Sequence, residues 1–326
     1  MNALVIPTNS AARLAEFLQA WAPWPWDRII VVQDEPTASL VIPDELREDA
    51  AERLECHAWE DIDAAIPDPS LISRKDSAIR SFGFWRAWAT GAEIIFTLDD
   101  DCFPAGPGFV ERHRENLYRT PAWQSSVPGM RVRGLPYRNT GVLRDVHVSM
   151  GLWRGVPDID AVSTLAGLDE PLGAVRTRVM PAAQYFPLSG MNVAFRREVA
   201  CLMYFPPMGQ GRPFRRFDDI WGGVTLQRIC RHLEYSITCG EPVVDHRRAS
   251  DPFVNLEKEA PGIVANEHLW EAVDAVPLTA TSPHGCMREL GTALAAGDGY
   301  LADWGRSIIG WCGLFDQAPV AAAPGA

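Results

Sequence analysis

The sequence predicts an α/β protein in which a mostly parallel sheet carries helices on its faces. Three short apolar runs, rich in β-branched and aromatic residues, have the length of buried strands, and stretches with helical spacing lie between them. This alternation is typical of βαβ units. The chain has 326 residues and is 47% hydrophobic, so it can form one large α/β domain or two smaller ones with a substantial core.

The N-terminal third supplies the alternating elements. Ser10 can cap the first helix, whose apolar residues are spaced by three and four, and Pro23 and Pro25 end it. The expected elements are, in order, a strand at Leu4–Asn9, a helix from Ser10 to Trp21, a strand at Arg28–Asp34, a helix near Pro43–Leu54, a helix opening at Ser73–Ser77 and a strand at Glu93–Leu98.

Beyond about residue 105 the alternation is less regular, and Gly and Pro punctuate the chain. The expected elements are a helix at Phe109–Tyr118, short strands or loops at Arg131–Pro136 and His147–Trp153, a strand within Phe186–Phe195, a helix at 220–233, a strand end at Val243–His246 and two helices within His268–Phe315, divided at Gly297–Gly299. We therefore expect a catalytic domain over 1–265, a helical subdomain over 266–316 and a disordered tail over 317–326.

The composition excludes several classes of protein. The net charge of −12 argues against non-specific nucleic-acid binding, and no apolar run approaches the length of a membrane span. The N-terminus has no basic region followed by a long apolar stretch, so we expect no secretory signal. The seven cysteines form no CxxC pair, which is typical of reduced thiols in a cytoplasmic protein.

Three consecutive carboxylates, Asp99, Asp100 and Asp101, follow the third buried strand. Because strand side chains alternate, we expect Asp99 and Asp101 on one side, where they can hold Mg²⁺ or Mn²⁺, and Asp100 on the other, where it can meet a ribose hydroxyl. The alternative is a solvated acidic turn. A metal held by such carboxylates usually shares its ligands with substrate phosphates.

Other charged residues are expected near the same edge of the sheet. Asp34 ends the second strand, and Arg74, Lys75 and Arg80 lie at or just beyond a helix start, where backbone N–H groups favour anions. Carboxylates and basic side chains at one sheet edge indicate a metal–diphosphate site. The alternative is an ordinary solvated helix start.

Several longer motifs are similar to those of a known family. They are Ser73–Ala78, Phe96–Phe103, Gly151–Trp153 with Pro157–Ala161, Gly190–Phe195, Phe217–Trp221 and Ala249–Leu256. Together they closely resemble the reversibly glycosylated polypeptides, or UDP-arabinopyranose mutases, over about Leu4–Gly262, whereas the last ~60 residues match poorly. The resemblance implies a GT-A-like, Rossmann-like mixed sheet flanked by helices with a C-terminal helical extension.

The family also implies dependence on Mn²⁺ or Mg²⁺ and interconversion of the pyranose and furanose forms of a UDP-sugar. It implies reversible self-glycosylation on an arginine, which matches Arg133 here. The family's second arginine, seven residues later, corresponds to Thr140, so Arg138 or Arg144 is expected to replace it.

The resemblance assigns roles to individual residues. Asp101 is the first expected metal ligand, Asp99 assists it, and His246 is either a third ligand or merely hydrogen-bonded. The residues expected to contact the base, the ribose or the diphosphate are Asp34, Arg74, Lys75, Asp76, Arg80, Asp99 and Asp100.

The remaining assignments concern the sugar. Asp218 and Asp219 are expected to act as a base or to hold sugar hydroxyls, with helix capping as the alternative. Asp158 and Asp160 are expected to bind sugar hydroxyls or only to form a turn. The other residues assigned to the substrate are Arg138, Trp153, Asn192 and Trp221.

Three functions follow from this reading. The first is a UDP-sugar mutase, the second is a glycosyltransferase with the same donor site and an external acceptor, and the third is a non-catalytic subunit of a hetero-complex. The expected partner is a UDP-sugar, with no nucleic acid and no membrane insertion, and a homo-oligomer is possible.

Overall fold

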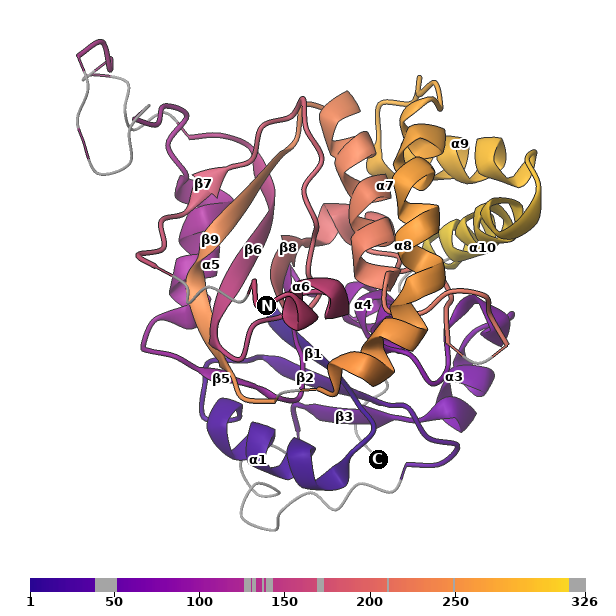
Figure 1. The fold of residues 1–326 in the computed structure, drawn as a ribbon. Coiled ribbons are helices and arrows are strands. Elements are labelled where there is room, and N and C mark those ends of the chain that lie inside the picture. Colours follow the sequence, from indigo (N-terminus) through magenta and orange to yellow (C-terminus); the bar gives the residue numbers. More distant parts are fainter. Residues whose placement is uncertain are drawn as a thin grey trace.

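The computed structural model describes residues 1–38, 52–125, 130, 133–136, 138, 143–168, 173–209, 211–248 and 250–316. Within these residues a single sheet of nine strands forms the centre of the molecule, in the order β3-β2-β1-β4-β8-β6-β9-β5, with β7 paired to β9 (Figure 1). The strands are β1 (Asn2–Thr8), β2 (Arg28–Gln33), β3 (Leu54–His57), β4 (Ile94–Leu98), β5 (Cys102–Pro104), β6 (Val146–Gly155), β7 (Arg178–Val179), β8 (Asn192–Arg196) and β9 (Ser236–His246).

The sheet is mixed rather than wholly parallel. Strands β3, β2, β1 and β4 are parallel, as the alternation of strand and helix predicts. Strand β8 then runs antiparallel between β4 and β6, and β6 is parallel to β9. The predicted α/β class with a mixed sheet flanked by helices is confirmed.

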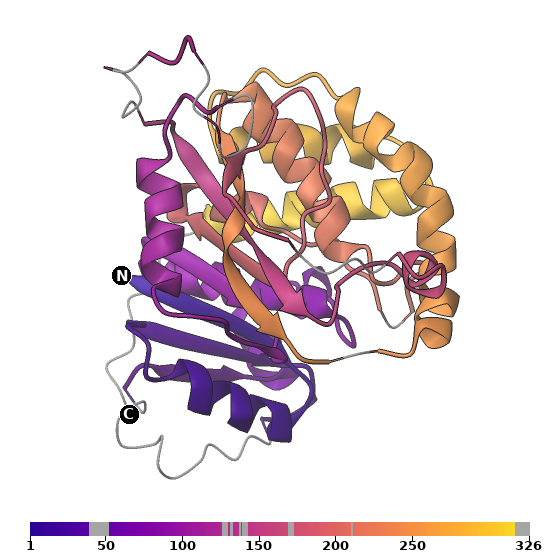
Figure 2. The ribbon, with the colours of Figure 1, turned by 60° about the vertical axis from the view of Figure 1, so that its left-hand side comes forward.

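Helices cover both faces of the sheet (Figure 2). One apolar core joins one face to α1 (Ala11–Trp21) and α5 (Phe109–Arg119). A second, larger core joins the other face to the remaining long helices. These are α4 (Arg80–Ala89), α7 (Asp218–His232), α8 (Pro252–Asp274), α9 (Pro283–Ala295) and α10 (Gly299–Phe315), with the shorter α3 (Trp59–Ala65) and α6 (Ala161–Leu165) at the periphery.

Most predicted elements appear close to their expected places. Ser10 caps α1 by accepting a hydrogen bond from the backbone N–H of Arg13, and the last two helices are divided where Gly297–Gly299 predicts. The predicted boundary at residue 265 lies inside α8, which is continuous there, so the division into two domains stays a prediction. The tail over 317–326 lies outside the described residues.

Two expected elements differ from the structure. The helix expected near Pro43–Leu54 falls mostly outside the described residues, and Leu54 begins β3 because it pairs with Ile29 at the sheet edge. The helix expected to open at Ser73–Ser77 starts later: Asp76 caps a short 3₁₀ turn and α4 begins at Arg80. The described residues 133–136 form a turn, in agreement with the loop alternative expected at Arg131–Pro136.

Several strands begin or end at the same edge of the sheet. Strands β1, β2 and β4 end there, at Thr8, Gln33 and Leu98. Because β8 is antiparallel, it begins at the same edge, with Asn192 opposite Leu98. The end of β9 reaches this edge too, where His246 pairs with Cys102.

Two further predictions can be compared with the structure. All seven cysteines are described and none forms a disulfide, as expected for reduced thiols. Among the helices that the structure describes, none is long and apolar enough to cross a membrane.

Candidate functional site

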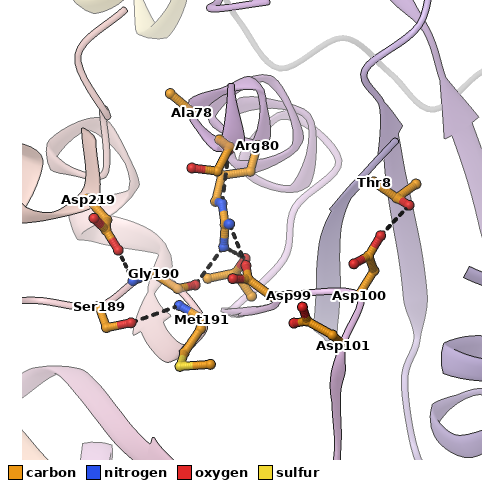
Figure 3. A network of polar contacts seen from close by, with 12 residues as sticks. Thr8, Ala78, Arg80, Asp99, Asp100, Asp101, Ser189, Gly190, Met191 and Asp219 are labelled. Atoms are coloured by element: carbon orange, nitrogen blue, oxygen red, sulfur yellow. Dashed lines mark hydrogen bonds and ion pairs between the residues drawn. The ribbon is translucent and has the colours of Figure 1, made fainter. Parts of the chain in front are cut away.

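Asp100, just after β4, forms hydrogen bonds to residues of β1 and α1. Its carboxylate accepts a hydrogen bond from Thr8 Oγ1 at 2.5 Å (Figure 3). It also accepts one from Arg13 Nε at 2.9 Å. The side chain is buried, and burial raises its pKa despite these two hydrogen bonds. Both carboxylate oxygens therefore have partners within the protein, which joins β4 to β1 and α1. Contact with a ribose stays a prediction.

Asp101 lies opposite His246, with Asp101 Oδ1 3.6 Å from His246 Nε2. That oxygen is buried and has no hydrogen-bond partner among the described residues. His246 Nδ1 donates to the backbone oxygen of Val156 at 2.8 Å, which directs Nε2 toward Asp101. Burial lowers the pKa of His246, but its interactions with Asp101 and Val156 outweigh burial and raise it.

This pair has the chemistry of a cation site. Asp101 Oδ1 forms no hydrogen bond among the described residues, and its ion-pair partner, His246 Nε2, is 3.6 Å away, so a closer ligand would satisfy this buried oxygen better. A histidine whose other nitrogen donates to a backbone carbonyl is the usual arrangement of a metal ligand. Mg²⁺ is often held by only one or two protein carboxylates together with substrate phosphates. Asp101 and His246 therefore fit the predicted ion.

Asp99 faces a different partner. Arg80 Nη2 donates to Asp99 Oδ1 at 2.5 Å, and Arg80 is only 2% exposed. Within the described ranges, no group of three or more His, Cys, Asp or Glu side chains is arranged to hold a metal ion. The expected trio of Asp99, Asp101 and His246 is thus not assembled, because the chain leaves β4 in a turn at Asp100 rather than continuing as a strand.

The two carboxylates at the start of α7 lie close enough to Arg80 for their charges to raise its pKa. Asp218 accepts a hydrogen bond from Ser77 Oγ at 2.7 Å, and Asp219 accepts one from Gly190 N at 2.7 Å. Burial and the charge of Asp218 raise the pKa of Asp219 to about 8. Burial also raises the pKa of Asp218. The residue at the helix cap is Phe217, which makes no side-chain hydrogen bond, but Asp219 Oδ1 accepts from the backbone N–H of Ile220 at 2.9 Å in the first turn of α7.

Two more carboxylates complete this cluster. Asp76 accepts from Ala78 N at 2.9 Å, and burial and the charge of Asp218 raise its pKa. Asp158 accepts from Ser189 Oγ at 2.9 Å, and burial and the charge of Asp99 raise its pKa. Several carboxylates crowded around one guanidinium favour a site that receives hydroxyl donors or further cations.

Asp160 takes the alternative role that its turn position indicates. Its carboxylate accepts from the backbone N–H and the hydroxyl of Ser163, both at 2.8 Å, and so caps α6. The side chain is exposed. This accounts for Asp160 without a substrate, and a sugar contact stays a prediction.

Asp34 organises the loop that precedes α4. It accepts from Lys75 N, Asp76 N and Trp59 Nε1, each at 2.9 Å. Lys75 adopts a left-handed backbone with φ of 57°. The cationic ends of Lys75 and Arg74 lie 5.1 and 5.0 Å from the ring centre of Trp59. Asp34 therefore shapes this loop, and its contact with a nucleotide stays a prediction.

Two residues assigned to the substrate are core residues instead. Asn192 is fully buried, and its amide donates to the backbone oxygens of Leu152 and Pro242 while its oxygen faces His113. Trp221 is also fully buried, against the rings of Phe214 and Phe217, which precede α7, and of Tyr300 on α10. Neither side chain is open to a ligand. Trp153 is partly buried and packs against both apolar cores, so its assignment stays a prediction.

The predicted catalytic Arg133 is not joined to the aspartates by any contact among the described residues. Both Arg133 and Arg138 are exposed. Their segment is closed at its base by a bridge between Pro121 and Leu143, just before β6 begins. His246 pairs with the last residue of β6, at the opposite end of that strand.

The sequence analysis missed the segment before β8. Ser189 and Gly190 contact the aspartate cluster, yet neither residue is charged. The available signal was that Gly190 begins the motif Gly190–Phe195, whereas nothing marked Ser189. Two cavities, of about 570 and 660 Å³, lie elsewhere. The larger is lined by Arg74 and Met208, next to the loop that Asp34 holds, and neither is lined by Asp99–Asp101.

Comparison with known proteins identifies the family. UDP-arabinopyranose mutase 1 of Arabidopsis thaliana is 34% identical, covering 96% of this chain and 92% of that protein. UDP-arabinopyranose mutase 1 of Oryza sativa subsp. japonica is 36% identical, covering 87% of this chain and 79% of that protein. A solved structure, a putative nucleotide-diphospho-sugar transferase from Desulfovibrio desulfuricans G20, has a TM-score of 0.34 and 10% identity, covering 83% of this chain and 96% of that one.

The family model extends past the segment in which the sequence motifs occur. The model described as reversibly glycosylated polypeptide matches residues 3–319, so the likeness continues beyond Gly262 into the C-terminal helices. The expectation that the last part of the chain falls outside the resemblance was wrong. With this match over nearly the whole sequence, the chain belongs to the reversibly glycosylated polypeptide family.

Proposed function

We propose that this protein is an enzyme that interconverts the pyranose and furanose forms of a UDP-sugar such as UDP-arabinose. The observation that carries the proposal is its similarity, over 96% of the chain, to a protein named as a UDP-arabinopyranose mutase. The site at the carboxyl edge of the sheet supports it, since this is where α/β sheets bind nucleotides.

We extend the proposal to a divalent cation, Mn²⁺ or Mg²⁺. Asp101 and His246 would hold it, because the unpartnered Asp101 oxygen and the orientation of His246 suit a ligand pair. Asp99, whose Oδ1 is bound by Arg80, would assist only through its second oxygen. When bound, the ion would neutralise charge on the departing diphosphate.

The carboxylates of the cluster would bind the sugar and transfer protons during ring exchange. Ring exchange requires the anomeric C–O bond to break, the ring to open and a different hydroxyl to close it. Asp219, whose pKa is raised to about 8, can be protonated or ionised near neutral pH. It can therefore give a proton to one ring oxygen and take one from another hydroxyl. Asp158 and Asp218 would accept hydrogen bonds from other hydroxyls.

Arg133 would form the reversible adduct. In that step the bond from the anomeric carbon to the diphosphate oxygen breaks and a bond to a guanidinium nitrogen forms. UDP leaves, and a carboxylate takes the guanidinium proton, since the side chain is otherwise protonated. Asp218 and Asp219 are the candidates for that base. The alternative is that Arg133 only grips the diphosphate.

The deciding experiment is incubation of the purified protein with UDP-arabinopyranose and Mn²⁺. Chromatography should show the furanose form accumulating, and intact-mass spectrometry should show a pentose adduct that excess UDP removes. Arg133→Lys should keep UDP binding but lose both signals, whereas Arg306→Lys, at an exposed arginine of α10 outside the site, is the matched control. Glycosylation of an added acceptor without furanose would favour a transferase. UDP binding without any turnover would favour a non-catalytic subunit.

We further propose a cytoplasmic location, which the seven unpaired cysteines support. Self-association is a further expectation, and light scattering of the purified protein measures it.

A further inference from the structure

Arg80 joins three segments that are far apart in the sequence. Its Nε donates to the backbone oxygen of Ser77 at 3.0 Å, and its Nη2 donates to Asp99 Oδ1 at 2.5 Å. Its Nη1 donates to the backbone oxygen of Gly190 at 2.6 Å and to Thr97 Oγ1 at 3.3 Å (Figure 3). The guanidinium therefore connects the start of α4, the end of β4 and the loop before β8.

Gly190 is held from both sides. Its carbonyl accepts from Arg80, and its N–H donates to Asp219 at 2.7 Å. A Cβ at this position would lie 3.0 Å from Phe205 Cε2, 3.3 Å from Asp219 Cβ and 3.4 Å from Arg80 Nη1. The absence of a side chain thus lets this peptide lie between the two charged groups.

These contacts form a continuous chain from Asp99 through Arg80 and Gly190 to Asp219. One end lies beside the pair proposed to hold the cation, and the other is the proposed acid and base. Arg80 itself is only 2% exposed and four protein groups take its hydrogen bonds, so it is poorly placed to grip a diphosphate. This differs from the role that its place in the sequence predicts.

We propose that Arg80 is a positioning residue of this site, one that sets Asp99 directly and Asp219 through Gly190 without contacting the nucleotide-sugar. The inference rests on the proposed function for its kinetic consequence. Its geometry is that of a planar fork, which a lysine cannot reproduce, because one ammonium nitrogen cannot reach all of these partners along the same directions.

The charges nearby are consistent with this role. Burial lowers the pKa of Arg80, but Asp99, Asp218 and Asp219 outweigh burial and raise it, so the guanidinium stays charged. It offsets part of the repulsion among these carboxylates. A neutral replacement would leave the aspartates both less ordered and more repulsive.

The test compares Arg80→Lys with Arg86→Lys, a matched control on the same helix. Arg86 donates to Glu55 at 2.8 Å, outside the aspartate cluster. We expect Arg80→Lys to bind UDP with Mn²⁺, and to show a KM, within about threefold of wild type, while kcat falls by about 100-fold, the size of effect that misplaced catalytic groups produce. Hydrogen exchange at Gly190 should accelerate. Arg86→Lys should change none of these.

A second variant covers the case in which Arg80→Lys does not fold. Gly190→Ala introduces a Cβ that crowds the same peptide. It should also leave UDP binding and KM nearly unchanged while kcat falls, by a smaller factor than in Arg80→Lys. Normal kcat in either folded variant would overturn the inference. So would a loss of UDP affinity as large as the loss of rate, since that marks direct contact with the diphosphate.

The same measurements separate this inference from the proposed function. If wild-type protein binds UDP but exchanges no ring forms, the mutase proposal fails. The rate of amide hydrogen exchange at Gly190 still shows whether Arg80 orders this peptide. An equal rate in wild type and Arg80→Lys would overturn the inference that it does.

Discussion

His113 on α5 is a buried histidine that the fold keeps neutral, so protein stability should fall in mild acid. His113 Nε2 lies 3.0 Å from Asn192 Oδ1, to which it donates, and Nδ1 accepts from the Ser149 hydroxyl at 2.9 Å. The rings of Phe96 and Phe109 pack against it. Burial lowers its pKa to about 3, although the Asn192 hydrogen bond opposes that shift.

The size of the effect follows from this shift. Below about pH 6.5 the unfolded chain binds a proton at this side chain, whereas the folded chain stays neutral there down to a pKa of about 3. The free energy of unfolding therefore falls by about 1.4 kcal/mol per pH unit, or about 2 kcal/mol by about pH 5. Above about pH 7 this contribution to stability is fully present.

The assay is urea unfolding of wild type and His113→Gln at about pH 7 and about pH 5, monitored by circular dichroism. The variant cannot titrate here, so its deficit relative to wild type should shrink by about 2 kcal/mol between these conditions. Aspartates with raised pKa values affect both proteins and cancel in the difference. A deficit that does not change with pH would refute a neutral buried His113.

Three other perturbations test the site. Asp101→Asn should lower kcat by about 100-fold or more, the effect of losing one stabiliser of leaving-group charge, and weaken UDP binding with Mn²⁺, whereas Asp303→Asn, at an exposed aspartate of α10, should not; equal loss in both would count against the cation pair. Gly209→Ala places a Cβ 2.6 Å from a backbone oxygen, so thermal unfolding should show it about 1–3 kcal/mol less stable than Gly211→Ala, which meets nothing within 4 Å; equal stability would contradict this. Arg133→Lys should bind UDP in calorimetry yet lose ring exchange, and normal exchange would exclude a covalent role.

The parallel half of the sheet could be predicted from local patterns. Short apolar runs alternate with helical spacing, and neighbouring strands of a βαβ unit are usually adjacent in the sheet. That was enough to place Asp34 and Asp99 at one edge, and the structure confirms that β2 and β4 end there.

The second half of the sheet depends on pairing between distant segments, which local periodicity does not encode. Strand β8 inserts antiparallel between β4 and β6 and so brings Gly190 beside Arg80. The sequence offers no charge at Gly190 to mark it. The contact between this peptide and Asp219 could therefore be seen only in three dimensions.

Residue type alone also fails to separate core residues from site residues. Trp221 and Asn192 are types often found in sugar sites, yet both are fully buried. The spacing of Phe217, Trp221 and Val224 on α7 indicates a buried helix face and was the signal against a substrate role for Trp221. For Asn192 the satisfied amide becomes visible only once β6 and β9 are placed around it.

The central claim is that this protein exchanges ring forms of a UDP-sugar at the edge of the sheet that carries Asp101 and His246. Its most direct test follows the purified protein with UDP-arabinopyranose or UDP-arabinofuranose, each with Mn²⁺, by chromatography until the composition stops changing. The account predicts that both reactions reach the same ratio of the two forms and that Asp101→Asn reaches it at least about 100-fold more slowly. Protein that binds UDP yet leaves both starting compounds unchanged would contradict it.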